Sequence, residues 1–193
     1  MPPALTFDRV TKEYARDSAE PAQVLREVNL EIAAQEIFCI VGPSGCGKTT
    51  LLNIAAGFIP ATSGRVLMEG NTVNGPQSRC GFTFQADAVF PWMTVAGNVG
   101  YGLQWNGTPP DRRRTIVDGY LKRVGLASFA KHWPRELSGG MRKRVDLARA
   151  FAIDPPILFL DEPFGSLERR RCNSYCLISG ATIAKPCSLS PMT

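Results

Sequence analysis

A strand, a glycine-rich loop and a helix follow one another without a break early in the chain, and this succession constrains the fold most strongly. Residues 36–41 (EIFCIV) form a nearly continuous apolar run, as expected of a strand buried on both faces. The run leads directly into residues 42–49 (GPSGCGKT), and residues 49–57 (TTLLNIAAG) predict the following helix, closed by Gly57 and Pro60.

The loop fits the pattern G-x-x-x-x-G-K-[ST], in which backbone N–H groups of a glycine-rich turn and a helix N-terminus face an anion. Lys48 is expected to reach the β- and γ-phosphates of a nucleotide, and Thr49 to coordinate Mg²⁺. The sequence therefore predicts a nucleotide site formed by Gly42, Pro43, Ser44, Gly45, Cys46, Gly47, Lys48, Thr49 and Thr50.

Two acids end a second buried strand. Residues 157–160 (ILFL) are apolar and lead into Asp161 and Glu162. Open α/β sheets bind ligands at the carboxyl ends of their strands, so both acids are expected to face the glycine loop. We expect Asp161 to be a Mg²⁺ partner and Glu162 to be the catalytic carboxylate that orients or deprotonates an attacking water.

A second anion-binding turn is predicted at residues 137–141 (LSGGM). Ser138 is expected to cap the N-terminus of a helix over residues 138–153, where Gly139 and Gly140 expose their backbone N–H groups. Two phosphate-binding turns in one domain are understandable if two copies of the chain pack head to tail and share each nucleotide.

The remaining pattern predicts an α/β fold interrupted by a helical insertion. Alternating apolar residues indicate strands near residues 5–10, 28–32, 65–69 and 79–84, and helical periodicity indicates helices over residues 95–103, 111–124 and 138–153.

Composition excludes several classes of protein. No apolar run in the 193 residues approaches the ~18–20 that a membrane-spanning helix needs, and the N-terminus lacks the pattern of a secretion signal. We therefore expect a cytoplasmic chain. The net charge is +5, but Arg169, Arg170, Arg171 and Lys185 carry +4 of it, which argues against a nucleic-acid partner. The cysteines form no C-x-x-C pair, which disfavours a cysteine metal site.

Over residues 4–168 the chain resembles the ATP-binding subunit of an ABC importer, with Walker A, Q-loop, signature, Walker B and the start of the D-loop in order. The resemblance implies an ATPase coupled to transport. Its P-loop NTPase (RecA-like) core would comprise residues 1–85 and 154–168, and its helical subdomain residues 86–153. It implies that Tyr14, otherwise a core aromatic, stacks on adenine. Gln85 would touch Mg²⁺ and the attacking water. Ser138, Gly139 and Gly140 would contact the γ-phosphate of the ATP that a second copy of the chain holds.

Residues 84–95 (FQADAVFPWMTV) are similar to importers of nitrate, of sulfonates including taurine, and of bicarbonate. The resemblance implies a second ATPase copy, a transmembrane permease contacted near the Q-loop and, indirectly, a periplasmic solute-binding protein. It places the chain peripherally on the cytoplasmic face of the membrane. Trp92 is interpreted either as a packing residue or as a permease contact. The same segment disfavours a soluble ABC ATPase of DNA repair or translation.

The resemblance stops after Glu168. No histidine follows Glu162, and the remaining residues contain no acid and three of the six cysteines. We interpret residues 169–193 as a disordered, non-family tail produced by a frameshift or truncation, with natural divergence as the alternative. The last strands of the sheet are then expected to be missing and hydrolysis to be low. The alternative function is a nucleotide-binding fragment without transport activity.

Overall fold

The computed structural model describes residues 3–16, 19–77, 80–85, 88–161 and 174–179. In chain order, its elements are β1 (Leu5–Arg16), β2 (Ala19–Ile32), β3 (Ile37–Val41), α1 (Lys48–Ala55), β4 (Ser63–Met68), β5 (Asn71–Thr72), β6 (Cys80–Thr83), α2 (Val95–Trp105), α3 (Pro110–Arg123), η1 (Ala127–Phe129), η2 (Pro134–Glu136), α4 (Gly139–Ala152), β7 (Ile157–Leu160) and β8 (Ser174–Ser179). No helix in these ranges is both long and apolar enough to span a membrane.

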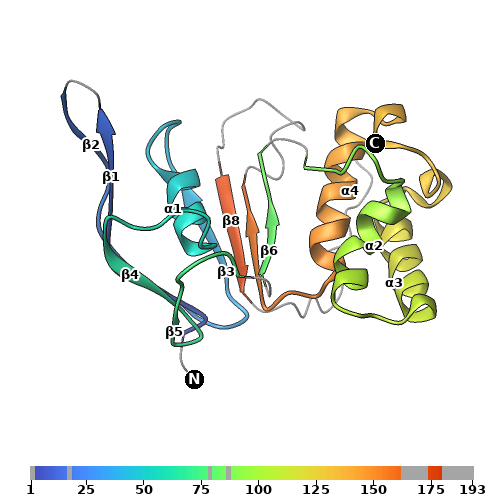
Figure 1. Cartoon of the computed structure of the whole chain (residues 1–193), viewed down its shortest axis with the longest axis horizontal. Coiled ribbons are helices and arrows are strands. Elements are labelled where there is room, and N and C mark those ends of the chain that lie inside the picture. Colours follow the sequence, from blue (N-terminus) through green and yellow to red (C-terminus); the bar gives the residue numbers. More distant parts are fainter. Residues whose placement is uncertain (1–2, 17–18, 78–79, 86–87, 162–173, 180–193) are drawn as a thin grey trace, which may run out of the picture.

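Two sheets organise the chain. An antiparallel sheet has the strand order β2-β1-β4-β5, and a second sheet has the order β3-β8-β7-β6. Helix α1 lies between the two sheets, whereas α2, α3 and α4 gather beyond β6 (Figure 1). The expected α/β fold with inserted helices is confirmed.

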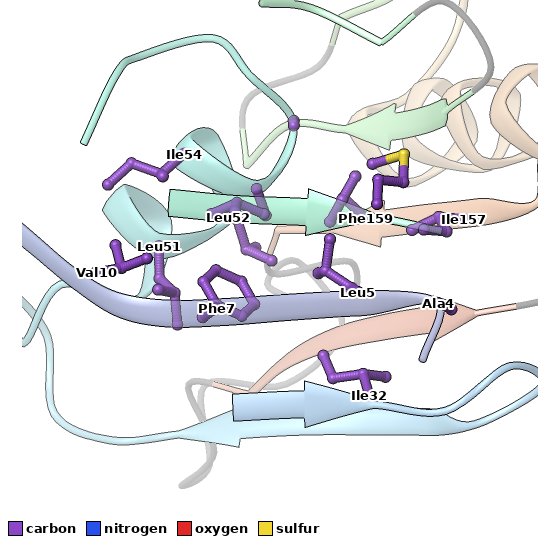
Figure 2. Packing of buried hydrophobic residues seen from close by; sticks show 14 of the residues in the cluster. Ala4, Leu5, Phe7, Val10, Ile32, Leu51, Leu52, Ile54, Ile157 and Phe159 are labelled. Carbon is purple, nitrogen blue, oxygen red and sulfur yellow. The ribbon is translucent and has the colours of Figure 1, made fainter. Parts of the chain in front are cut away.

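Helix α1 is the centre of the main core. Leu51 and Leu52 are buried beside Leu5 and Phe7 of β1 and Phe159 of β7 (Figure 2). Burying a leucine or phenylalanine side chain contributes about 1.5–3 kcal/mol. This packing fixes α1, and therefore the loop that precedes it, against both sheets.

The helices of the insertion form a core of their own. Val99 of α2, Val117 and Leu121 of α3 and Val145 of α4 are buried together. Helix α4 also contacts the second sheet, because Ala150 packs with residues of β7. The insertion is thus joined to the sheet through α4.

The expectation that the strand before the glycine loop is buried on both faces is wrong. Phe38 and Ile40 of β3 pack against the main core, but Ile37 and Val41 are 68% and 67% exposed, and Cys39 between them is exposed. Side chains alternate across a strand, and the described elements cover only one side of β3.

Within the segment expected to be disordered, residues 169–193, the structure describes residues 174–179. These residues form β8, which pairs antiparallel with both β3 and β7. The apolar run in this segment has the composition of a strand, and the facing edges of β3 and β7 present backbone groups that need partners. Residues 169–173 and 180–193 lie outside the described residues.

Asn98 of α2 organises the segment before its own helix. The side chain is fully buried, and its Oδ1 accepts the Phe90 N–H at 2.7 Å. The two hydrogens of its Nδ2 are shared among the carbonyl oxygens of Phe90, Met93 and Thr94, which lie 3.0–3.2 Å away. The Thr94 carbonyl also accepts the Asn98 N–H, and the Phe90 carbonyl also accepts the Met93 N–H, so the amide adds to these turns and is a partner for the Phe90 N–H and the Met93 carbonyl.

Replacing this amide tests its role. Asn98→Ala removes the side-chain partner of the Phe90 N–H and of the Met93 carbonyl, each at about 1–3 kcal/mol, so we expect a loss of unfolding free energy on the order of 3 kcal/mol. Chemical denaturation measures it. Gln104→Ala, on the exposed side of α2, is the control and should change stability little. Equal stability of both variants would contradict this role.

A proline tests the position of β8. In Leu177→Pro the backbone loses an N–H within a strand paired on both sides, so we expect a lower melting temperature by thermal unfolding. Leu177→Val keeps the N–H and should melt near the parent. If the proline variant melts like the valine variant, β8 does not hold the sheet together.

Candidate nucleotide-binding site

The glycine loop has the conformation that its sequence predicts. Gly45 and Gly47 have φ of 80° and 95°, in the left-handed region that favours glycine. A Cβ at Gly47 would lie 3.0 Å from Val24 and Leu25 of β2, so a larger residue would push the loop away from the antiparallel sheet. The loop can therefore turn tightly into α1 only with glycine at this position.

Lys48 lies inside this loop. Its side chain is 5% exposed, and the ammonium donates to the carbonyls of Gly42 and Pro43 at 2.7 and 2.6 Å. The thiol of Cys46, an exposed residue, lies 3.6 Å from the same nitrogen. Thr49 and Thr50 are half-buried in the first turn of α1. A buried cation and a helix N-terminus thus face the same loop, which favours an anion there.

Asp161 and Gln85 follow neighbouring parallel strands. Asp161 is 3% exposed at the end of β7, and its N–H donates to the carbonyl of Thr83, the last residue of β6, at 3.0 Å. Gln85 is exposed two residues after that strand. The structure therefore places both predicted residues at the same edge of the sheet. Glu162 lies outside the described residues.

Ser138 caps α4 as predicted. Its Oγ accepts the N–H of Met141 at 3.3 Å, and Gly139 and Gly140 are exposed in the first turn. The backbone N–H groups of this turn can therefore receive an anion from outside the chain. Figure 1 shows α4 and α1 separated by β8 and β6, so the two anion-binding turns do not meet within one chain.

Tyr14 lies on β1 and is 41% exposed. The Lys12 ammonium lies 5.0 Å from the centre of its ring, within the range of a cation–π contact. The alternative that Tyr14 is a core aromatic is therefore wrong, and its stacking on adenine stays a prediction.

Two groups of aromatic side chains, one before and one after Gln85 in the sequence, were not predicted. Before Gln85, the rings of Phe84 and Phe58 stack with their centres 5.7 Å apart, and both side chains are partly exposed. After Gln85, the centre of the Phe90 ring lies 5.4 Å from that of Trp92 and 4.9 Å from that of Tyr101. Trp92 is 68% exposed. The proline–tryptophan segment was the only signal in the sequence, because exposure of the remaining rings depends on the fold.

Three charged residues of α4 were also not predicted as part of the site, namely Lys143, Asp146 and Arg149. Lys143 and Asp146 are buried and Arg149 is partly buried, and together they contact the segments on both sides of Gln85. Their spacing of three residues along one helix face was the signal available in the sequence.

Comparisons with known proteins agree with this geometry. Residues 25–165 match the family model described as ABC transporter. The taurine import ATP-binding protein TauB of Yersinia pestis bv. Antiqua (strain Antiqua) is 46% identical over 155 residues, which cover 80% of this chain and 60% of that protein. TauB of Roseobacter denitrificans (strain ATCC 33942 / OCh 114) is 42% identical over 164 residues, covering 85% and 61%.

A solved structure supports the fold. The dimeric ATP-binding cassette MJ0796, in a post-hydrolysis state bound to ADP and Pi, is 33% identical with a TM-score of 0.77, and the match covers 86% of this chain and 76% of that one. The chain spans about 60% of the length of the TauB relatives. The matched residues include the glycine loop, Gln85, the Ser138 turn and Asp161. The chain therefore belongs to the ABC transporter family.

Proposed function

We propose that this chain is the ATP-binding and ATP-hydrolysing subunit of an importer for taurine or a similar small solute, such as nitrate or another sulfonate. The observation that carries the proposal is the Lys48 ammonium, buried inside a loop whose tight turn requires glycine at position 47. The import of taurine by two relatives at 42–46% identity supports the substrate class.

The residues present fit ATP with Mg²⁺. Thr49 offers a hydroxyl and Asp161 a buried carboxylate, and Mg²⁺ prefers oxygen donors of this kind. When bound, Mg²⁺ would neutralise charge on the phosphates. Phosphate oxygens would compete with the Gly42 and Pro43 carbonyls for the Lys48 ammonium, while the N–H groups of the loop hold the phosphate chain.

Hydrolysis requires a positioned water. Gln85 follows β6 at the edge of the sheet where β7 leads into Asp161, and Glu162 is the next residue in the sequence. We assign Gln85 the role of orienting the water and contacting Mg²⁺, and Glu162 the role of accepting its proton. Tyr14 would hold the adenine ring by stacking.

A second copy of the chain completes the site. The Ser138 turn is exposed and separated from α1 by the second sheet, so its N–H groups would contact the γ-phosphate held by a partner. The dimer of the related cassette supports this arrangement.

The two aromatic groups that precede and follow Gln85 in the sequence are the proposed contact for a transmembrane permease. Large exposed apolar side chains can mark interaction sites, and Phe84 and Trp92 are both exposed on either side of Gln85 in the sequence. The chain would then act on the cytoplasmic face of the membrane. It would serve a periplasmic solute-binding protein indirectly and bind no nucleic acid.

Removing the Lys48 ammonium tests the nucleotide site. Lys48→Ala should weaken ATP affinity about 10–100-fold, since a charged hydrogen bond contributes roughly 1.5–3 kcal/mol. Calorimetric titration with Mg·ATP measures the loss. Lys122→Ala, an exposed lysine of α3, should bind as the parent does. Parental affinity in Lys48→Ala would refute the assignment.

Replacing Glu162 tests hydrolysis. Glu162→Gln keeps size but removes the base, so steady-state phosphate release should fall about 100-fold or more while Mg·ATP affinity stays within about twofold. If both proteins hydrolyse ATP equally, Glu162 is not the base. A parent protein that binds ATP but releases no phosphate would favour the alternative, a nucleotide-binding fragment without transport activity.

A further inference from the structure

Three charged side chains form a network along one face of α4. Asp146 is fully buried, and its Oδ1 accepts from the Arg149 guanidinium at 2.8 Å. The Lys143 ammonium lies 4.0 Å from its Oδ2, and Lys143 is 6% exposed. A buried carboxylate is unfavourable unless cations compensate its charge, so Asp146 favours the present positions of both cations: a charged hydrogen bond holds Arg149, and charge attraction favours Lys143.

Both cations also contact the backbone on either side of Gln85. The Lys143 ammonium donates to the carbonyl of Phe84, one residue before Gln85. The Arg149 guanidinium donates to the carbonyl of Ala88, three residues after it, at 2.6 Å, and lies 4.7 Å from the ring centre of Phe90. Asp146 therefore aligns two donors that hold the two flanks of one functional residue.

The same helix begins at the signature turn. Ser138 caps α4, and Lys143 follows within the second turn. A short α-helix is stiff, so a displacement of Ser138 would be transmitted to the two carbonyls that α4 holds. The Phe84 contact also crosses from the inserted helices to the end of β6.

We propose that Lys143, Asp146 and Arg149 are positioning residues that fix Gln85 relative to the signature turn at Ser138. Gln85 and this turn would then respond together to nucleotide. The proposal rests on the role of Gln85 proposed above. It predicts that loss of one cation loosens the segment around Gln85 without loosening the glycine loop.

Deuterium exchange in the nucleotide-free protein tests the positioning. In Lys143→Met, which keeps an apolar stem, amide exchange in peptides covering residues 82–93 should rise about tenfold, while exchange in α1 stays unchanged. Lys143→Arg restores a cation and should exchange as the parent does. Arg144→Met is the matched control, since Arg144 donates to the carbonyl of Val124 from the same helix but is exposed.

The outcomes separate positioning from general stability. Unchanged exchange at residues 82–93 in Lys143→Met, or an equal rise in α1, overturns the proposal. Asp146→Asn releases both cations and should give a larger rise confined to the same peptides. If that variant does not fold, Lys143→Met alone decides.

A second readout links the network to nucleotide. In the parent, Mg²⁺ should increase the affinity for ATP. In Lys143→Met this Mg²⁺-dependent gain in affinity should be about tenfold smaller. The ATP affinity measured in EDTA should be the same in both proteins. An unaltered Mg²⁺ effect overturns the functional part of the proposal. A parent that binds no ATP would refute the proposed function, whereas the exchange measurement would still decide whether the network positions the segment.

Discussion

The packing of α1 between the two sheets is the interaction on which the candidate site depends. Leu52 is almost completely buried among side chains of β1 and β7, so the helix can neither rotate nor slide without opening the main core. Lys48 is the first residue of that helix, and Gly47 packs against β2. Contacts with β1, β2 and β7 therefore hold the helix and the phosphate loop in place. A rigid scaffold of this kind fixes the Lys48 side chain before any ligand binds.

The sequence predicted the parts of the fold that follow from local chemistry. The glycine loop, the Ser138 cap and the strand that ends at Asp161 each depend on residue types within a few positions, and each lies where expected. The exposed side of β3 could not be predicted, because burial of Ile37 and Val41 depends on what other elements cover them. Strand β8 was missed since its partners are distant in sequence.

The burial of charged residues in the candidate site could not be predicted from the sequence either. Lys143 and Arg144 are adjacent, yet Lys143 is buried against the end of β6 and Arg144 is exposed. Helical periodicity says that the two point in different directions, but only the packing of α4 decides which direction is the interior. Both residues are cations in the sequence, but in the structure Lys143 donates to the Phe84 carbonyl and Arg144 to the Val124 carbonyl.

The pairing of β3 with β8 has a consequence for how the chain folds during synthesis. Ile37 pairs with Ile178, and in the described residues β3 has no other strand neighbour. Contacts between residues so far apart form slowly, because the intervening chain must first be closed into a loop. The strand that carries the phosphate loop would therefore leave the ribosome with both edges unpaired, when β1, β2 and β4 can already associate. Until β8 has been synthesised, this strand is open to incorrect pairing.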